Sequence, residues 1–308
     1  MTDYKPYLSV VIPVFNGSAT LEALFLRTKT VLDGKNISFE VVFVDDGSTD
    51  DSWPLIQKLK SGHGKEVTGI RLARNAGQQA ATFCGLLEAS GEWIITMDDD
   101  LQTPPEEIPK LLDAAGDREA TLIYGVFAAP QHSRLHDFGA RIFRRLLRKV
   151  ALDFSDGSSF RLLHSSLIKR LPTELRLLNH IDPVLSWAGS GILRVEVNHE
   201  KRLYGKSGYT FLRLLSLARE ILLLYSTLPL RFIIWLGFFF AAVSFGMGIY
   251  FLTLKLTVGA QLGFSALIVA ITFFSGMILM SLGILGAYIS NLYTIGIGRP
   301  PFVIQNKT

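Results

Sequence analysis

The chain has 308 residues, 49% of them hydrophobic, and a mean hydropathy of +0.32, which indicates one α/β domain plus a part that faces lipid. The excess of 31 Lys and Arg over 27 Asp and Glu does not indicate nucleic-acid binding, because all of it lies beyond Glu220, in an apolar C-terminal part. A single cysteine, Cys84, excludes an internal disulfide framework and a cysteine-rich zinc site.

Residues 1–200 alternate between short apolar runs and helical patterns. Strands are expected at Leu8–Val14, Phe39–Val44, Val67–Leu72, Trp93–Met97, Thr121–Val126 and Gly191–Val197. Helices are expected at Ala19–Leu32, Ser52–Leu59, Gln78–Ala89 and Pro105–Ala115. This alternation predicts an α/β fold with a mostly parallel sheet and helices on both faces.

Polar residues follow the predicted strands, at the edge of a parallel sheet where ligands bind. These groups are Pro13-Val14-Phe15-Asn16, Asp45-Asp46-Gly47-Ser48, Arg74-Asn75-Ala76-Gly77 and Asp98-Asp99-Asp100. No GxGxxG follows the first strand and no GxxxxGK[ST] occurs, so a dinucleotide-binding Rossmann domain and a P-loop NTPase lose their main support.

The strongest chemical signal is the run of three carboxylates after the fourth strand. Strand alternation would put Asp98 and Asp100 on one side and Asp99 on the other, with Gln102 joining the first side if the backbone stays extended. A few hard oxygen ligands with room left for phosphate suit Mg²⁺ or Mn²⁺. An Asp-rich turn that caps the next helix is the alternative, and the second acidic pair, Asp45 and Asp46, weighs against it.

A basic amphipathic helix is predicted at Gly139–Val150. It carries five Arg and Lys residues on one face and apolar residues on the other, a pattern that suits anionic headgroups. An ordinary surface helix packed on the sheet is the alternative. The longer apolar stretch Tyr209–Leu228 is expected to lie along the membrane interface.

Two membrane spans are predicted near the C-terminus. Residues Phe232–Leu254 carry no charge and are bracketed by Arg231 and Lys255, and Phe264–Ser290 is long enough to span again. No signal-peptide pattern opens the sequence, and basic residues flank the spans on one side, so the N-terminal part is expected to be cytosolic. Small residues recur four apart, as at Gly237 and Ala241, which permits either a homo-oligomer or packing of the spans within one chain.

Four stretches resemble the sugar-nucleotide domain of inverting family 2 glycosyltransferases with the GT-A fold: Ser9–Asn16, Val42–Asp50, Arg74–Ala81 and Ile95–Glu107. Together with the two spans, the chain resembles polyprenyl-phosphate glycosyltransferases from about residue 7 to 303, including bacterial undecaprenyl-phosphate glucosyl- and aminoarabinosyl-transferases and dolichyl-phosphate mannose synthases. The stretches DDDLQTPPEEIPKLL and RNAGQQAAT are the most specific. One departure is Asn179–Asp182, which stands where the family often has an Arg-containing run.

The resemblance implies roles for individual residues. Asp98, Asp100 and Gln102 would hold the metal ion. The nucleotide sugar would contact Pro13, Phe15, Asp45, Asp46, Arg74, Gly77, Gln78, Asp98 and Asp99, with the base contact left open between Asp45 and Asp46. Asp100 and Asp156 would be catalytic, with Asp156 aligning the acceptor or sugar or removing a residual proton. The lipid phosphate would meet Arg202, Lys206, Arg134 and Arg141.

The sequence therefore predicts inverting transfer of a sugar, with a UDP-sugar as the preferred donor, to undecaprenyl or another polyprenyl phosphate at the cytosolic face of the inner (plasma) membrane. A GDP-mannose-dependent enzyme is one alternative, and a membrane-tethered scaffold that binds nucleotide sugar without turnover is another. The expected organisation is a GT-A domain at 1–207, an interfacial helix at 208–230, two transmembrane helices at 231–298 and a cytosolic tail at 299–308.

Overall fold

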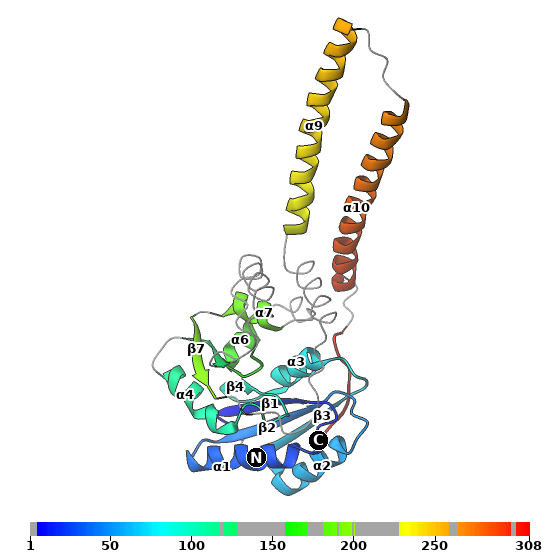
Figure 1. Ribbon diagram of the computed structural model, residues 1–308. Helices are drawn as coiled ribbons and strands as arrows, with labels where there is room; N and C mark the ends of the chain where they lie inside the picture. The colour runs from blue at the N-terminus through cyan, green and yellow to red at the C-terminus, as the bar shows by residue number, and fades with distance from the viewer. Residues whose placement is uncertain are drawn as a thin grey trace. The chain divides into compact units, whose positions relative to one another are not determined.

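The computed structural model describes residues 5–116, 120–127, 158–171, 181–189, 191–198, 200, 228–258, 264–296 and 300–308. The chain divides into two compact units (Figure 1). The first unit comprises Met1–Ser207 together with Gly298–Thr308, and the second comprises Gly208–Ile297. The C-terminal residues thus belong to the same unit as the N-terminal ones.

In the described part of the first unit, the strands form one sheet of eight, in the order β7-β5-β6-β4-β1-β2-β3-β8. The strands are β1 Leu8–Val14, β2 Phe39–Asp45, β3 Val67–Leu72, β4 Trp93–Thr96, β5 Leu122–Phe127, β6 Arg161–His164, β7 Ile192–Val197 and β8 Ile304–Lys307. The central strands β4, β1, β2 and β3 are mutually parallel, as are β5 and β7. The predicted α/β fold with a mostly parallel sheet is confirmed, and the antiparallel strands β6 and β8 are additions to it.

Helices cover both faces of this sheet, as predicted. In the described part of this unit the helices are α1 Leu21–Gly34, α2 Ser52–His63, α3 Gln78–Glu88, α4 Ile108–Gly116, α6 Ser165–Arg170 and α7 Ile181–Ala188, with 3-10 turns at Gly64–Glu66 and Pro105–Glu107. Residues of α1, α2 and α4 pack on one face and residues of α3, α6 and α7 on the other. Strand alternation divides β1 between the two faces, because Val10 and Ile12 join the first cluster and Val11 joins the second.

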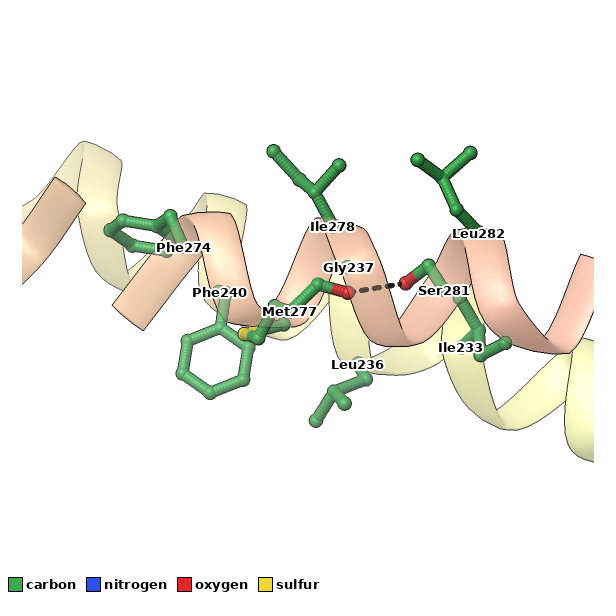
Figure 2. Close-up of a pocket in the computed structure, with 9 residues that line it drawn as sticks. All are labelled: Ile233, Leu236, Gly237, Phe240, Phe274, Met277, Ile278, Ser281 and Leu282. Carbon is green, nitrogen blue, oxygen red and sulfur yellow. Dashed lines mark hydrogen bonds between the residues drawn. The ribbon is translucent and has the colours of Figure 1, made fainter. Parts of the chain in front are cut away.

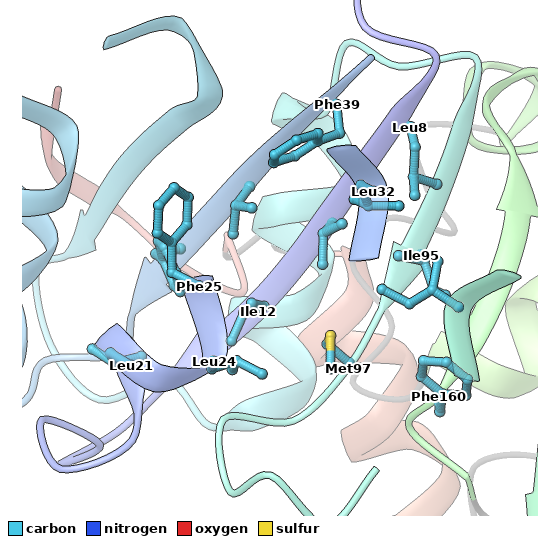
Figure 3. Packing of buried hydrophobic residues seen from close by; sticks show 14 of the residues in the cluster. Leu8, Ile12, Leu21, Leu24, Phe25, Leu32, Phe39, Ile95, Met97 and Phe160 are labelled. Atoms are coloured by element: carbon cyan, nitrogen blue, oxygen red, sulfur yellow. The ribbon is translucent and has the colours of Figure 1, made fainter. Parts of the chain in front are cut away.

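The first cluster shows how the sequence pattern becomes packing (Figure 3). Leu21, Leu24, Phe25 and Leu32 of α1 recur at helical spacing and are fully buried against the sheet. Full burial of an apolar side chain such as that of Phe25 contributes roughly 1.5–3 kcal/mol to stability. This packing holds the ends of the parallel strands in a rigid frame.

The second unit contains two long apolar helices, α9 Leu228–Val258 and α10 Phe264–Gly296. They have 31 and 33 residues, so at about 1.5 Å per residue each exceeds the roughly 30 Å of a bilayer core. Their most apolar windows, Leu230–Met247 and Phe273–Ser290, have mean hydropathies of 1.8 and 1.7 and are not buried within the chain. Both helices are therefore long and apolar enough to cross a membrane, and they are not buried as core helices of a soluble protein mostly are.

The two helices contact each other through aromatic residues and leave an apolar cleft between them. The ring centroids of Phe240 on α9 and Phe273 on α10 lie 5.3 Å apart. Figure 2 shows the residues that line the cleft, whose volume is about 420 Å³. A Cβ added at Gly237, Gly246 or Gly283 would meet no other atom within 4 Å. These glycines are therefore not the places where the two helices approach each other closely.

Candidate functional site

The parallel order β4-β1-β2-β3 brings the polar residues that follow these strands to one edge of the sheet. β1 leads to Phe15, whose side chain is 50% exposed, whereas Pro13 lies within β1 and is buried. The loop after β3 presents Arg74 to solvent, and Gln78, the first residue of α3, is also exposed. The edge therefore offers an exposed aromatic ring, carboxylates and cationic or amide groups over three neighbouring strand ends.

Both carboxylate oxygens of Asp46 are hydrogen-bonded to the loop after β3. Its Oδ1 accepts a hydrogen bond from the Ala76 amide at 2.6 Å, and its Oδ2 accepts one from the Gly77 amide at 2.8 Å. Gly77 is the N-cap of α3, so the carboxylate also lies at the positive end of that helix. Burial raises the pKa of Asp46, and the two backbone amides act against that shift. The side chain therefore ties the 45–48 turn to the 73–77 loop.

Asp45 is the last residue of β2 and is completely buried. Its Oδ1 accepts the Ser48 amide at 2.9 Å, and its Oδ2 lies 3.3 Å from Arg71 Nε. That Oδ2 atom has no hydrogen-bond partner among the described residues. The sequence left the base contact open between Asp45 and Asp46. Both carboxylate oxygens of Asp46 accept backbone amides, whereas only one oxygen of Asp45 accepts a hydrogen bond among the described residues.

Gly47 allows the 45–48 turn and the 73–77 loop to touch. Its φ of +72° lies in the left-handed region, and a Cβ added there would lie 2.8 Å from the Asn75 backbone nitrogen. A larger residue would push the two backbones apart. The two loops are therefore in direct backbone contact.

Asp98 is held by two side-chain donors from different elements. Gln78 Nε2, at the start of α3, donates to Asp98 Oδ1 at 2.6 Å, and Ser159 Oγ donates to Asp98 Oδ2 at 2.6 Å. Burial raises the pKa of Asp98, while the Ser159 hydrogen bond lowers it and the charge of Asp100 raises it. No sequence signal predicts Ser159 as a partner of Asp98, because the two residues are 61 positions apart in the chain.

Asp99 turns toward the loop after β1. A Cβ added at Gly17 would lie 2.3 Å from Asp99 Oδ2, so only glycine leaves room for this carboxylate. Burial, together with the neighbouring charges of Asp98 and Asp100, raises the pKa of Asp99 to about 7. Burial is the larger cause, and the neighbouring carboxylates add to it, so Asp99 titrates much closer to neutral pH than an ordinary aspartate.

Asp98, Asp99 and Asp100 do not alternate between the two sides of a strand as predicted, because β4 ends at Thr96 and the aspartates lie after it. Leu101 has a φ of +59°, so the backbone does not continue extended to Gln102. Asp100 Oδ1 accepts a hydrogen bond from the backbone amide of Gln102 at 3.1 Å, so the Asp100 carboxylate contacts the backbone of Gln102. Among the described residues no three His, Cys, Asp or Glu side chains are grouped as metal ligands, so a cation at this turn would need a neutral oxygen, such as that of Gln102, beside the carboxylates.

Arg161 introduces a buried positive charge near the carboxylates. It lies on β6, is 3% exposed, and its charge lowers the pKa of Asp98. Its Nη1 donates to Asp182 Oδ1, which also accepts a hydrogen bond from the Tyr124 hydroxyl at 3.2 Å. The sequence analysis assigned a role to neither Arg161 nor Asp182. The run Asn179–Asp182 attracted notice only as a departure from the family pattern.

Several predicted site residues lie outside the described part of the chain. They are Asp156, Arg134, Arg141, Arg202 and Lys206. The predicted helix 139–150 and nearly all of the interfacial stretch 209–228 also fall outside it. The described site is therefore the edge of the sheet at the ends of β1 to β4, and the roles predicted for these five residues stay predictions from the sequence.

Comparison with known proteins agrees with the sequence motifs. The profile of the family described as "Glycosyl transferase family 2" matches residues 9–174. The undecaprenyl-phosphate 4-deoxy-4-formamido-L-arabinose transferase of Edwardsiella ictaluri is 31% identical, with 99% of this chain and 96% of that one covered. The protein of the same name from Pseudomonas aeruginosa is 33% identical, with coverages of 98% and 91%.

Among solved structures, the chain is similar to glucosyl-3-phosphoglycerate synthase from Mycobacterium tuberculosis, in a complex with Mn²⁺, uridine diphosphate and glucosyl-3-phosphoglycerate. The sequence identity is 20% and the TM-score is 0.49. The likeness covers 71% of this chain and 78% of that one.

Proposed function

The chain belongs to glycosyltransferase family 2, and we propose that it transfers a sugar from a nucleoside diphosphate sugar to a polyprenyl phosphate. The support for this acceptor is the likeness to undecaprenyl-phosphate transferases, which extends over at least 98% of this chain and therefore includes α9 and α10. A scaffold without turnover is the competing function. The observation that carries the catalytic function is the cluster Asp98–Asp100 at the strand ends, in which Gln78 and Ser159 hold Asp98.

A divalent cation, Mg²⁺ or Mn²⁺, fits the chemistry of this cluster. The available ligands are hard oxygens. Burial, and after it the charges of Asp98 and Asp100, raises the pKa of Asp99 to about 7, and a bound cation would offset both effects. Asp98, Asp100 and Gln102 would hold the ion. When bound, it would act as a Lewis acid that offsets negative charge on the departing nucleoside diphosphate.

Side chains of the chain itself would bind the nucleotide and orient the acceptor. Asp46 keeps the 73–77 loop against the 45–48 turn, and the exposed ring of Phe15 offers a surface for a nucleobase. The nucleophile would be an oxygen of the lipid phosphate, whose second pKa of about 6 leaves it largely ionised at neutral pH. A strong base is therefore not needed, and Asp156 would either align the acceptor or sugar or accept the residual proton.

The acceptor phosphate would be bound by cationic side chains. Arg202 and Lys206 lie in the sequence just before the apolar interfacial stretch, and Arg134 and Arg141 lie in or near the basic segment. A guanidinium can bind a phosphate through two charge-assisted hydrogen bonds, which suits a headgroup at the membrane surface. These cations would also offset the repulsion between the two substrates' phosphates.

The pairing of β8 with β3 supports the proposed membrane topology. The residues up to Ser207 and those from Gly298 onward belong to the same unit, so a chain that leaves this unit to cross a membrane must cross it again to return. Only Lys255 carries a formal charge between the two predicted spans, while Arg231 and Arg299 lie on their other ends. By the positive-inside rule this distribution supports a catalytic unit at the cytosolic face of the inner (plasma) membrane.

The test is a transfer assay with full-length protein in liposomes that contain undecaprenyl phosphate, using UDP- and GDP-sugars with and without Mn²⁺. We expect transfer from a UDP-sugar, and transfer from GDP-mannose alone would favour the mannosyltransferase alternative. Nucleotide binding without transfer from any donor would favour the scaffold.

The acceptor side has its own test in the variant Arg202→Ala. Losing one charge-assisted contact is expected to raise the KM for undecaprenyl phosphate about ten- to hundredfold, with donor affinity unchanged. The alternative is that Arg202 only orients the spans, in which case the variant misinserts. Correctly inserted protein with unchanged acceptor kinetics would remove Arg202 from the acceptor site.

A further inference from the structure

The C-terminal segment, residues 300–308, forms one edge of the catalytic sheet. Its strand β8 pairs antiparallel with β3, with Ile70 opposite Lys307, Arg71 opposite Asn306 and Leu72 opposite Ile304. At the end of the ladder the Thr308 amide donates to the Gly69 carbonyl at 2.9 Å. The segment follows α10 in the chain and covers a strand that would otherwise expose its backbone.

The C-terminal segment also extends past the ladder to the 73–77 loop. The Ala73 amide donates to the Val303 carbonyl at 2.8 Å. Phe302 packs against the second apolar cluster, as does Ala76 of the loop. Lys307 forms an ion pair with Glu88 at the end of α3, the helix that the loop leads into. The segment therefore holds the loop by its backbone and the following helix by a side chain.

The end of β3 and the 73–77 loop contact the C-terminal segment on one side and the 45–48 turn of the donor site on the other. Arg71 of β3 lies 3.3 Å from Asp45 Oδ2, and Asp46 accepts both the Ala76 and Gly77 amides. The Gly47 position leaves no space for a Cβ against Asn75. The end of β3 and the 73–77 loop are thus held between the C-terminal segment and the 45–48 turn. A shift of the loop would be transmitted to Asp46 and, through Gln78, to Asp98.

We propose that the C-terminal segment is a positioning element of the donor site: by holding the 73–77 loop, it makes nucleotide affinity depend on residues that follow the second apolar helix. The inference rests on the proposed function, because that function makes this edge a nucleotide-sugar site. Its physical consequence is that the donor site is complete only when the chain has returned from α10 and paired with β3.

The test compares two neighbouring substitutions in full-length protein. Phe302→Ala removes a side chain that packs on the second cluster, whereas Val303→Ala changes a side chain that is 53% exposed and keeps the backbone hydrogen bond. We expect Phe302→Ala to raise the Kd for UDP with Mn²⁺ and the donor KM about three- to tenfold, as is usual for coupling through packed neighbours. The acceptor KM and kcat should change less than about twofold, and Val303→Ala should resemble the wild type. Phe302→Leu should fall between the two.

Hydrogen exchange separates this inference from the proposed function. Faster exchange at the amides of residues 73–77 in Phe302→Ala, together with weaker UDP binding, supports the positioning role. Unchanged UDP affinity in folded Phe302→Ala overturns it, whether or not exchange changes. If Phe302→Ala does not fold, the same comparison between Phe302→Leu and Val303→Ala decides. Wild-type protein that binds neither UDP nor GDP refutes the proposed function instead, and the exchange rates then decide whether the segment holds the loop.

Discussion

Arg161 on β6 and Asp182 on α7 form an ion pair across two elements, with Nη1 and Oδ1 2.5 Å apart, in which Arg161 is buried and the Asp182 side chain is 21% exposed. Arg161 is 3% exposed, and its Nε has no hydrogen-bond partner among the described residues. The Tyr124 hydroxyl donates to the same Asp182 oxygen. A cation buried this deeply depends on its partner, because removing one member of such a pair leaves an uncompensated charge.

Loss of this pair should therefore destabilise the catalytic unit strongly. We expect Asp182→Ala to lower the free energy of unfolding by about 3–5 kcal/mol, since it leaves the Arg161 guanidinium buried without its carboxylate. Tyr124→Phe removes one hydrogen bond and should cost about 1 kcal/mol. Urea unfolding in detergent, followed by tryptophan fluorescence, measures both.

A suitable control is Arg170→Ala, because Arg170 is an exposed residue of α6 and its replacement should change stability by less than about 0.5 kcal/mol. If Asp182→Ala were as stable as Arg170→Ala, the ion pair would not be a determinant of stability.

The carboxylate cluster gives the second prediction. Asp98→Asn and Asp100→Asn remove charge where the proposed cation binds, so transfer should fall about 100-fold or more, as when one electrostatic contact to a developing charge is lost. Binding of Mn²⁺ should weaken in parallel, measured by titration calorimetry. Asp113→Asn, at an exposed position of α4, should leave both quantities unchanged. Full transfer activity in EDTA would argue against a metal at this site.

The third prediction concerns the role of Asp46 in the loop. Asp46→Asn keeps the shape, but its amide group can accept through one oxygen only, so one of the Ala76 and Gly77 amides loses its partner. The donor KM should rise about tenfold, because a hydrogen bond to a charged group contributes about 1.5–3 kcal/mol and part of that is transmitted to the site. Steady-state kinetics in the donor test this, with Asp51→Asn as the exposed control. Equal KM values for the two variants would show that the loop does not depend on Asp46.

The sequence predicted the central fold because apolar periodicity is a local signal. Leu8–Val14 and Val67–Leu72 match β1 and β3 residue for residue, and Phe39–Val44 falls one residue short of β2. β8 carries no such signal, because its four residues are all exposed. Its partner strand lies far away in the chain, with Gly69 and Thr308 separated by 239 positions. Pairing at that distance is decided by the assembled sheet and not by the segment itself.

The candidate site was likewise predictable from the sequence only in part. The strand ends could be located from the sequence because parallel strands bring their carboxyl ends to one edge. The side chains that hold the site could not, since Ser159 and Asp182 meet their partners only through the antiparallel placement of β6 beside β4 and through α7. Strand alternation did not describe Asp98–Asp100, because the strand ends two residues earlier, at Thr96.

The last prediction concerns Cys84, the only cysteine of the chain, which is buried on the face of α3 that packs against the sheet. Burial raises the pKa of its thiol from 9.0 to about 12, and the charge of Glu88 acts in the same direction. At pH 8 roughly one thiol in 10,000 is ionised in the folded protein, against about one in ten for a thiol with the ordinary pKa of 9.0. Because the thiolate is the reactive form, iodoacetamide should label the native protein at least about 1,000-fold more slowly than the protein in denaturant.

The same shift fixes the sign of a pH dependence in stability. The folded state keeps the Cys84 proton up to about pH 12, whereas the unfolded chain releases it near 9.0, so this group favours folding below pH 9 and the advantage is lost as the pH rises from 9 to 12. Replacement by alanine removes the ionisable group, and stability should then fall less steeply over that range than in the wild type. Unfolding midpoints at pH 8, 9 and 10 for wild type and Cys84→Ala, together with labelling rates by mass spectrometry, measure both effects. Labelling of the native protein at the rate of the denatured chain would mean that α3 opens from the sheet far more readily than its packing implies.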